Sequence, residues 1–428
     1  MAHLRPPRAF LLPRRVQPGY VLSFLKYNAA RCRNFQMPAQ TYKCHVDAEP
    51  LHRYQRGGYH PLGLGDVLND GRYKILHKLG WGSYSTTWAA KDQSKDQYVA
   101  IKVSVSDVGN THELDILRAI SVLPRGHSGW SCVNHMLDDF TVVGPNGTHD
   151  CLVLELVGPS VADVVATHCE DDRLPAKLAK FFAHQALQGI DFLASANIGH
   201  GDLHTRNLAI TMPDLNSLNE TDFLDRLGKP LTGPVSRLDG KSLPCSVPSH
   251  IVRPAPFQKG DIVLSSQSVK IIDFGEAFFN NNAPKTLHTP LPIRAPEVIF
   301  GEALDHRVDL WSAGCLIFEL VTGQPPFDTI MLTPPVLVQQ MMGFATDGLP
   351  SRWRDKWQAM QKDLPEEDQS YTLPEWLAEV YFDDNKHAEF TREDIVSVGK
   401  IIESMLRFEP SLRVAAKDAL ADAWFDRG

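Results

Sequence analysis

The sequence predicts an α+β fold of two lobes, with a small β-rich lobe followed by a larger, mainly helical one. Three observations lead to this prediction. Between residues 73 and 156 the chain carries runs of β-branched and aromatic residues separated by turn residues. After Gly158, apolar residues recur at helical spacing over long segments. Hydrophobic residues make up 43% of the chain and charged residues 22%, which is the composition of a globular protein.

The predicted small lobe is a sheet of about five strands with one helix. The helix is expected over 110–120 because Leu114, Leu117 and Ile120 recur at helical spacing. The strands are expected over 73–78, 86–90, 97–103, 133–143 and 151–156.

Helices dominate the rest of the chain, and two segments interrupt them. The clearest helices are expected over 174–196, 308–322 and 395–406. Seven prolines between residues 212 and 262 indicate a long loop or an insertion. A second insert is expected at about 343–392. The carboxylate-rich stretch 358–394 forms either a solvated acidic face or a docking surface for a basic partner.

The N-terminus differs in charge from the rest of the chain. Residues 1–46 contain eight lysines and arginines and no Asp or Glu, as in organelle transit peptides. Four prolines before residue 20 would interrupt an amphipathic helix, so a disordered basic leader or a nuclear signal are the other interpretations. Location in the cytoplasm, the nucleus or the mitochondrion therefore stays open. An extension over 47–72 precedes the two lobes, which are expected over 73–158 and 159–425.

The overall composition excludes several classes of protein. With 43 basic and 51 acidic residues the net charge is −8, so no direct binding of nucleic acid is expected. No run approaches the ~18 apolar residues that a membrane-spanning helix needs. The seven scattered cysteines contain no C-x-x-C pair, which argues against a disulfide framework and fits a reducing compartment.

The first segment with chemical content is a glycine-rich turn between two predicted strands. Glycines at 80 and 82 allow backbone N–H groups to approach phosphate oxygens without hindrance from a Cβ atom. A plain hairpin with two glycines is the alternative interpretation. The candidate cofactor-binding residues of this segment are Leu79, Gly80, Trp81, Gly82, Ser83, Tyr84, Ser85 and Thr87.

A lysine on the next strand has a plausible acidic partner. Lys102 ends the run Val-Ala-Ile-Lys, and the following helix supplies Glu113. An ion pair between them would hold the ammonium group toward the α- and β-phosphates of a nucleotide. Asp115 is the other acidic residue in reach, and a surface lysine without a partner is the simpler alternative.

The strongest segment is His-Gly-Asp-Leu-His-Thr-Arg-Asn at 200–207. A carboxylate at Asp202 and a carboxamide at Asn207 can hold a nucleophilic hydroxyl and a Mg²⁺ ion on one loop. A second carboxylate, Asp273, follows an apolar strand and begins Asp-Phe-Gly. Mg²⁺ needs only one or two protein ligands of this kind. The run Ala-Pro-Glu at 295–297 completes the order.

This order of motifs resembles the eukaryotic protein kinase family over about Tyr73 to Phe425. The segment Asp-Leu-Trp-Ser-Ala-Gly at 309–314 looks like the family's helix that anchors the catalytic loop, and Arg413 like the ion-pair partner of Glu297. The glycine-rich segment, preceded by Gly-Tyr-His-Pro at 58–61, is similar to the SR-protein kinases. The resemblance implies a bilobal protein kinase fold and an ATP-dependent serine/threonine kinase.

The resemblance also implies a role for each candidate residue. Lys102, fixed by Glu113, would orient the phosphates of ATP, and Asp202 would orient the acceptor hydroxyl. Asn207 and Asp273 would bind Mg²⁺. The hinge would lie at Glu155 and Leu156, and the adenine slot would be lined by Leu79, Thr87, Ala100, Leu154 and Ala209.

Two departures from the family pattern lie in the catalytic loop. Gly201 stands where an Arg usually binds a phosphorylated activation loop, which implies activity without that phosphorylation. His204 stands where a Lys usually contacts the transferred phosphate, and an imidazole carries less charge near neutral pH. Arg206 is therefore the predicted contact of the γ-phosphate.

Two other functions remain open at this point. The run His-Gly-Asp-x-His-x-x-Asn also matches small-molecule kinases of the aminoglycoside and choline type, although these usually lack the Ala-Pro-Glu segment. A catalytically silent pseudokinase scaffold is the other alternative, although Lys102, Asp202, Asn207 and Asp273 are all present. The resemblance further implies a protein substrate of Arg/Ser-rich type, whereas the oligomeric state is unknown.

Overall fold

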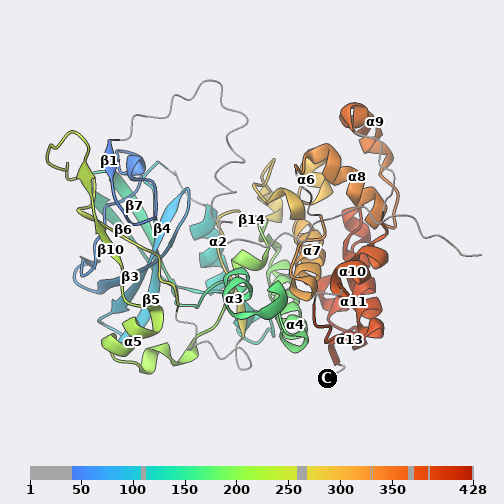
Figure 1. The fold of residues 1–428 in the computed structure, drawn as a ribbon, viewed down its shortest axis with the longest axis horizontal. Helices are drawn as coiled ribbons and strands as arrows, with labels where there is room; N and C mark the ends of the chain where they lie inside the picture. Colours follow the sequence, from blue (N-terminus) through green and yellow to red (C-terminus); the bar gives the residue numbers. More distant parts are fainter. Residues whose placement is uncertain are drawn as a thin grey trace, which may run out of the picture.

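The computed structural model describes residues 41–107, 112–257, 268–327, 329, 331–364, 371–383 and 386–426. In these ranges the chain forms an α+β fold, with a sheet at one end of the molecule and a group of helices at the other (Figure 1). This is the arrangement that the sequence predicts. Of the predicted basic leader, residues 1–40 lie outside the described ranges.

The small lobe is built on a six-stranded antiparallel sheet in the order β2-β3-β4-β5-β7-β6. Its register places Gly80, Thr87 and Lys102 in one row across three strands, and such partners share a face of the sheet. The row therefore brings the glycine-rich turn and the lysine to the same face. The bounds are Val67–Leu68 (β2), Tyr73–Trp81 (β3), Ser85–Asp92 (β4), Gln97–Ser104 (β5), Met136–Gly144 (β6) and Gly147–Glu155 (β7).

The sheet differs from the predicted one in two respects. Its sixth strand, β2, is a two-residue edge strand that the sequence does not predict. The strand expected over 133–143 begins only at Met136, because Val133 forms a bridge with Ile271 of the large lobe. The predicted helix over 110–120 is α2, His112–Ser121, and its first two predicted residues lie outside the described ranges.

The large lobe is organised around two buried helices. Helix α4 buries a stripe of nine residues, and almost every residue of α7 is buried, so α7 forms the centre of the lobe. The longer helices are Val161–His168 (α3), Ala176–Ser195 (α4), Val308–Thr322 (α7), Pro334–Phe344 (α8), Leu373–Tyr381 (α10) and Arg392–Met405 (α11). The shorter ones are Pro296–Phe300 (α6), Arg354–Met360 (α9), Ala416–Ala419 (α12) and Ala423–Asp426 (α13).

Four short antiparallel pairs complete the topology of the described residues, and the fourth joins the N-terminal extension to the insertion. Two of them lie in the catalytic region: β9 (Leu208–Ile210) pairs with β13 (Val269–Ile271), and β8 (Ile198–Gly199) pairs with β14 (Phe278–Phe279). These pairs hold the segments that carry Asp202, Asn207 and Asp273 side by side. The third pair, β10 (Thr232–Pro234) with β12 (His250–Val252), lies in the insertion.

Of the two interpretations of the proline-rich segment, a long loop or an insertion, the structure favours an insertion with secondary structure of its own. Residues 212–257 contain helix α5, Glu220–Leu227, and the β10–β12 pair, and they pack on the small lobe (Figure 1). Phe223 of α5 stacks on Tyr98 of β5 with ring centroids 3.7 Å apart. Asn219 caps the helix by accepting a hydrogen bond from the amide of Asp222 at 3.0 Å. The apolar face of α5 explains why this proline-rich segment is ordered.

The N-terminal extension also packs on the small lobe. Its strand β1, Tyr42–Lys43, pairs with β11, Ser236–Arg237, of the insertion. The extension and the insertion share an apolar cluster that includes Tyr54, Tyr59, Val235 and Ile251. Among the described helices, none has both the length and the apolar character needed to cross a membrane.

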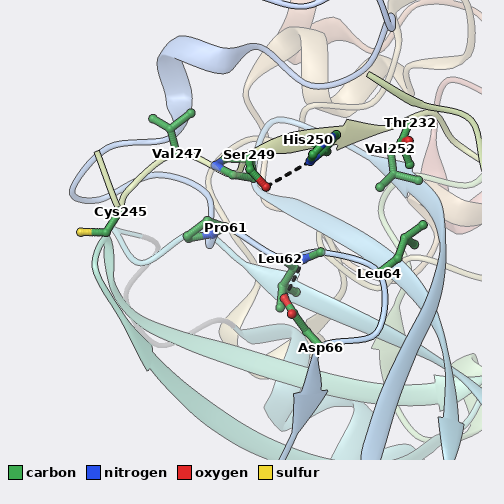
Figure 2. A pocket seen from close by; sticks show the side chains of 12 residues that line it. Pro61, Leu62, Leu64, Asp66, Thr232, Cys245, Val247, Ser249, His250 and Val252 are labelled. Atoms are coloured by element: carbon green, nitrogen blue, oxygen red, sulfur yellow. Dashed lines mark hydrogen bonds between the residues drawn. The ribbon is translucent and has the colours of Figure 1, made fainter. Parts of the chain in front are cut away.

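A cavity of about 550 Å³ lies where the extension meets the insertion (Figure 2). Residues 61–64 and Asp66 form one wall, and the other is formed by Thr232, Cys245, residues 247–250 and Val252. Ser249 contacts the ring of His250 at 3.1 Å along this second wall. None of the predicted nucleotide-binding residues lines it, so this cavity is separate from the candidate active site.

A buried histidine of the N-terminal extension makes the stability of the protein dependent on pH. Burial, together with the neighbouring His149, lowers the pKa of His60 to about 4. The unfolded chain binds this proton below about pH 6.5, whereas the native protein does not. We therefore expect the contribution of His60 to the free energy of unfolding to be constant above pH 7 and to fall between pH 6.5 and 4, by at most about 1.4 kcal/mol per pH unit.

Urea unfolding at several pH values measures this dependence. A His60→Phe variant should show a shallower slope between pH 6.5 and 4.5 than the wild type. His52 is exposed, so a His52→Phe variant is the matched control and should keep the wild-type slope. Equal slopes for all three proteins would contradict the assignment to His60.

Candidate active site

Three charged side chains from separate elements meet beside the sheet. The ammonium group of Lys102 lies 2.6 Å from a carboxylate oxygen of Glu113 and 2.8 Å from Oδ1 of Asp273. Glu113 comes from α2, as the sequence predicts for the partner of this lysine. Burial by itself would lower the pKa of Lys102, but the two carboxylates outweigh it and raise the pKa above its ordinary value. Lys102 is therefore a fixed positive charge.

The catalytic loop is anchored by a buried carboxylate on α7. Asp309 accepts hydrogen bonds from the amides of His200 at 2.6 Å and Gly201 at 2.8 Å. Its side chain is buried, and this burial raises its pKa. The sequence predicts this helix as the anchor of the loop, and the two hydrogen bonds confirm the contact.

Asp202 is oriented by Asn207 from the same loop. The side-chain amide of Asn207 donates to the backbone oxygen of Asp202 at 2.8 Å and to its Oδ2 at 3.1 Å. Oδ1 of Asp202 is buried, and within the described part of the chain it has no hydrogen-bond partner. A buried carboxylate oxygen without a partner is costly unless a ligand completes it. This oxygen is suited to accept a hydrogen bond from a substrate hydroxyl.

Asp273 and Asn207 present oxygen atoms that fit Mg²⁺. Because both donor contacts of Asn207 use its nitrogen, its amide oxygen is left for another partner. Lys102 lowers the pKa of Asp273 to about 2, so this carboxylate is fully ionised at neutral pH. The amide of Ile272 donates to the backbone oxygen of Asn207 at 2.9 Å, which holds the two residues together. One carboxylate and one amide oxygen match the preference of Mg²⁺ for few protein ligands.

The glycine-rich turn joins β3 to β4 in the same row as Lys102. The amide of Gly82 donates to the backbone oxygen of Ser85 at 2.9 Å and closes the turn. A Cβ atom added at Gly80 or Gly82 would meet nothing within 4 Å. Because no protein contact requires glycine here, the close approach of a ligand to the backbone is the better explanation. Ser83 and Tyr84 lie exposed at the tip of the turn.

The residues of the predicted adenine slot and hinge come from β3, β4, β5, β7, β9 and the segment after β7. Ala100 of β5 lies opposite Leu154 of β7. Leu79 and Leu156 are only partly buried and pack against the apolar cluster of the insertion. Ala209 is buried in β9, and Thr87 lies in the row with Lys102.

The hinge has fewer available amides than expected. The amide of Glu155 already donates to His135 at 3.0 Å, and that of Gly158 donates to Ile210 at 2.8 Å. The amides of Leu156 and Val157 lie between them, so Val157 is a further candidate for binding the purine edge. The sequence analysis missed Val157 because every residue type carries the same backbone amide.

Arg206 is not brought to the site in this structure. Its side chain is 54% exposed, and the guanidinium lies 3.9 Å from Asp163 of α3. His204 lies beside the catalytic carboxylate instead, with Nε2 3.5 Å from Oδ2 of Asp202. Nδ1 of His204 accepts a hydrogen bond from the amide of Arg206 at 3.2 Å, which directs Nε2 toward Asp202. The geometry therefore favours His204 over Arg206 as the neighbour of the transferred phosphate.

The position of Arg206 leads to a direct comparison of variants. We expect Arg206→Ala to change the turnover number less than threefold, because its side chain points to solvent and to Asp163. The removal of the imidazole in His204→Ala should reduce turnover by more than tenfold, since roughly one charge-assisted contact is lost. Steady-state kinetics with saturating ATP measures both values. A larger loss in Arg206→Ala than in His204→Ala would restore Arg206 to the role predicted from sequence.

The segment after Asp273 is held in place by hydrogen bonds to the catalytic loop and by contacts within the segment. Thr289 is buried, and its hydroxyl donates to the backbone oxygen of Gly201 at 2.6 Å. His288 contacts Glu276 at 2.9 Å. Gly201 has φ of +78°, and an added Cβ would lie 2.7 Å from the backbone oxygen of Glu276. The space beside Gly201 is thus closed, and an arginine would not fit there without a shift.

The two threonines of this segment should respond differently to mutation. Thr286 is exposed, so Thr286→Ala should leave turnover unchanged. The sequence analysis suggests no dependence on phosphorylation, but Thr289→Ala should still lower turnover because it removes a buried hydrogen bond worth about 1 kcal/mol. Thr289→Ser keeps the hydroxyl and should behave as wild type. A loss in Thr286→Ala beyond tenfold would indicate that phosphorylation is required.

Glu297 of the Ala-Pro-Glu run is paired with Arg413, as the sequence predicts. Two guanidinium nitrogens each lie 2.6 Å from one of the two carboxylate oxygens, and both side chains are buried. Arg413 also donates to the backbone oxygens of Arg307 and Arg407. By contrast, Glu366, Glu367 and Asp368 of the acidic stretch lie outside the described residues, so the choice between a solvated face and a docking surface stays a prediction.

Comparison with known proteins identifies the family. The model of the protein kinase domain matches residues 73–223 and 259–425. A serine/threonine-protein kinase SRPK of Physarum polycephalum is 29% identical over 391 residues, covering 86% of this chain and 88% of that protein. Protein kinase dsk1 of Schizosaccharomyces pombe is 28% identical and covers 67% of each chain. Human SRSF protein kinase 3 is 33% identical over 168 residues, which are 38% of this chain and 29% of that protein.

The match of the kinase domain is interrupted only between residues 223 and 259, where the insertion lies. It includes both glycines of the turn, the ion-paired lysine, the catalytic loop and Asp273. The relatives are all named as protein kinases. The chain therefore belongs to the protein kinase family, and within it resembles serine/threonine kinases of the SRPK type.

Proposed function

We propose that this protein transfers the γ-phosphate of ATP to serine and threonine hydroxyls of basic, Arg/Ser-rich proteins. The observation that carries the proposal is the convergence of the Lys102, Glu113 and Asp273 charges beside the Asp202–Asn207 pair. Phosphoryl transfer requires mainly positioning and neutralisation of charge, and these groups supply both. The similarity to the SRPK-type kinases supports a protein substrate.

Different residues of the chain bind the nucleotide and orient the acceptor hydroxyl. Lys102, held by Glu113, binds the α- and β-phosphates, and the turn 80–85 covers them with backbone amides. Asp202 accepts a hydrogen bond from the acceptor hydroxyl through Oδ1 and directs the oxygen toward the γ-phosphorus. Asn207 fixes Asp202 through the 3.1 Å contact with Oδ2. The proton of the hydroxyl leaves toward Asp202 as the new bond to the γ-phosphorus forms, and the bond between the γ-phosphorus and the β,γ-bridging oxygen breaks to release ADP.

Mg²⁺ is the metal that the oxygen donors fit. Asp273 and the amide oxygen of Asn207 would hold it. When bound, the ion neutralises charge on the β- and γ-phosphates. The low pKa of Asp273 means that no proton has to be displaced for binding at neutral pH.

The substrate class and the location are the finer parts of the proposal. Of the relatives, SRSF protein kinase 3 bears a substrate in its name, and the net charge of −8 suits a basic partner. A location in the cytoplasm or nucleus agrees with such a substrate. The basic leader remains open to the interpretations given above.

A single assay separates the proposed function from its alternatives. The purified full chain is incubated with Mg²⁺ and labelled ATP, and with one of four acceptors: an Arg/Ser peptide, the same peptide with Glu in place of Arg, kanamycin or choline. We expect transfer to the Arg/Ser peptide and at least tenfold less to the Glu peptide. Transfer to kanamycin or choline would indicate a small-molecule kinase, and ATP binding without transfer to any acceptor would indicate a pseudokinase.

A further inference from the structure

The glycine-rich turn is contacted from outside by the N-terminal extension. The hydroxyl of Tyr59 donates to the backbone oxygen of Gly82 at 2.7 Å, and the guanidinium of Arg53 donates to that of Ser83 at 2.6 Å. Tyr59 is 2% exposed, and the guanidinium carbon of Arg53 lies 5.0 Å from the centre of its ring. Two consecutive carbonyl groups of the turn are thus held by side chains that lie more than twenty residues earlier in the chain.

The two contacts fix the direction of two amides. In a trans peptide the carbonyl of one residue and the N–H of the next point in opposite directions within one plane. The described chain contains no cis peptide bond. Holding the oxygen of Gly82 therefore turns the N–H of Ser83 away from the extension, and holding the oxygen of Ser83 turns away the N–H of Tyr84. Without these two contacts the turn would adopt several backbone conformations, because its tip is exposed to solvent.

The extension is itself rigid at this point. The chain reverses between Arg53 and Tyr59, whose amide donates back to Arg53 at 3.0 Å. This reversal needs two glycines: Gly57 has φ of +87°, and a Cβ at Gly58 would lie 1.8 Å from the backbone oxygen of Arg53. The side chain of Asn146 donates to the backbone oxygen of Tyr59 at 2.6 Å and ties the reversal to the sheet.

A buried ion pair ties the same segment to the strand that leads into the turn. The ammonium group of Lys78 contacts Glu49 of the extension, and both side chains are buried. The hydroxyl of Tyr54 donates to the same carboxylate. Lys78 lies two residues before Gly80 on β3, so the extension holds the turn at its base and at its tip.

We propose that Arg53 and Tyr59 are positioning residues for the nucleotide, which orient the amides of Ser83 and Tyr84 for contact with its phosphates. This inference rests on the proposed function and assigns to the extension a role that the kinase motifs do not include. The part of the ligand that these amides would contact is the triphosphate group. The adenosine part of the nucleotide lies against the strands and the hinge and does not depend on these amides.

Binding of ATP and of adenosine to the full chain tests the proposal. Each contact is expected to contribute about 0.5–1.5 kcal/mol, so Tyr59→Phe and Arg53→Ala should each weaken ATP about twofold to tenfold, and the double variant more than either. Adenosine affinity should stay within twofold of wild type, because adenosine carries no phosphate. Arg56→Ala is the matched control, since Arg56 is exposed on the same segment.

The outcomes separate this inference from the proposed function. Tyr59→Phe keeps the packing of the ring, and thermal unfolding without nucleotide shows whether each variant is folded. Unchanged ATP affinity in Tyr59→Phe and in the double variant would overturn the inference, and so would an equal loss for adenosine. A wild-type chain that binds ATP but transfers no phosphate would overturn the proposed function alone. A wild-type chain that binds no ATP would overturn both.

Discussion

An Asp202→Asn variant is expected to lose about 10²- to 10⁴-fold in turnover number while its affinity for ATP stays close to that of wild type. One oxygen of the carboxylate is fixed by Asn207, and the other is buried and has no hydrogen-bond partner among the described residues, so that it can accept a hydrogen bond from the acceptor hydroxyl. The side-chain amide of Asn has nearly the same size as the carboxylate, but it is neutral and too weakly basic to take up the proton of the hydroxyl. Nucleotide binding depends on Lys102 and the turn, which the substitution does not touch.

Single-turnover kinetics and nucleotide binding measure the two effects separately. Asp139→Asn is the matched control, because Asp139 forms a surface ion pair with Arg118 at 2.8 Å in the small lobe. Its turnover should equal that of wild type. If Asp202→Asn kept more than a tenth of the wild-type turnover, the assignment of Asp202 as the residue that accepts the hydroxyl proton would be wrong.

The second large effect is expected for stability. Arg413→Ala should lower the free energy of unfolding by about 3–5 kcal/mol, because it leaves the carboxylate of Glu297 buried without its partner. The lost hydrogen bonds to the backbone of Arg307 and Arg407 add to this cost. Since Glu297 lies in the first turn of helix α6, directly after the segment that holds Thr289, we also expect lower activity at temperatures well below unfolding.

The exposed ion pair of Arg352 with Glu409 is the control for the buried pair of Arg413 with Glu297. Arg352 lies 2.7 Å from Glu409, but the two side chains are 43% and 32% exposed. Exposed pairs contribute only about 0–1 kcal/mol, so Arg352→Ala should change the free energy of unfolding by no more than that. Urea denaturation of both variants gives the two values. Equal losses in the two variants would show that burial does not govern the strength of the Arg413 pair.

The sequence predicts the fold class and the central residues of the site because their chemistry depends on residue type. A lysine, two carboxylates and a carboxamide at these spacings have few other uses, and the structure brings Lys102, Glu113 and Asp273 into contact. The direction of Arg206 was not predictable in this way. It depends on the position of Asp163, which comes from a helix about forty residues earlier.

Contacts made to backbone atoms could also not be predicted from the sequence. The bonds of Arg53 and Tyr59 to carbonyl groups of the turn leave no pattern, because every residue supplies such an oxygen. The order of the insertion, in contrast, had a signal. Asn219 followed by Phe223 and Leu227 is a helix cap with two apolar residues four apart, but because of the surrounding prolines the segment is interpreted as a long loop or an insertion, without a helix.

The packing of the insertion has a consequence for anyone who shortens this chain. The kinase pattern ends at residue 223 and resumes at 259, which makes the segment between them look dispensable. Yet Leu227 of this segment belongs to the same apolar cluster as Leu76, Tyr98 and Phe223, and the stack of Phe223 on Tyr98 lies at the border of the segment. A truncated protein would expose part of this apolar cluster to water. We therefore expect it to self-associate at working concentrations.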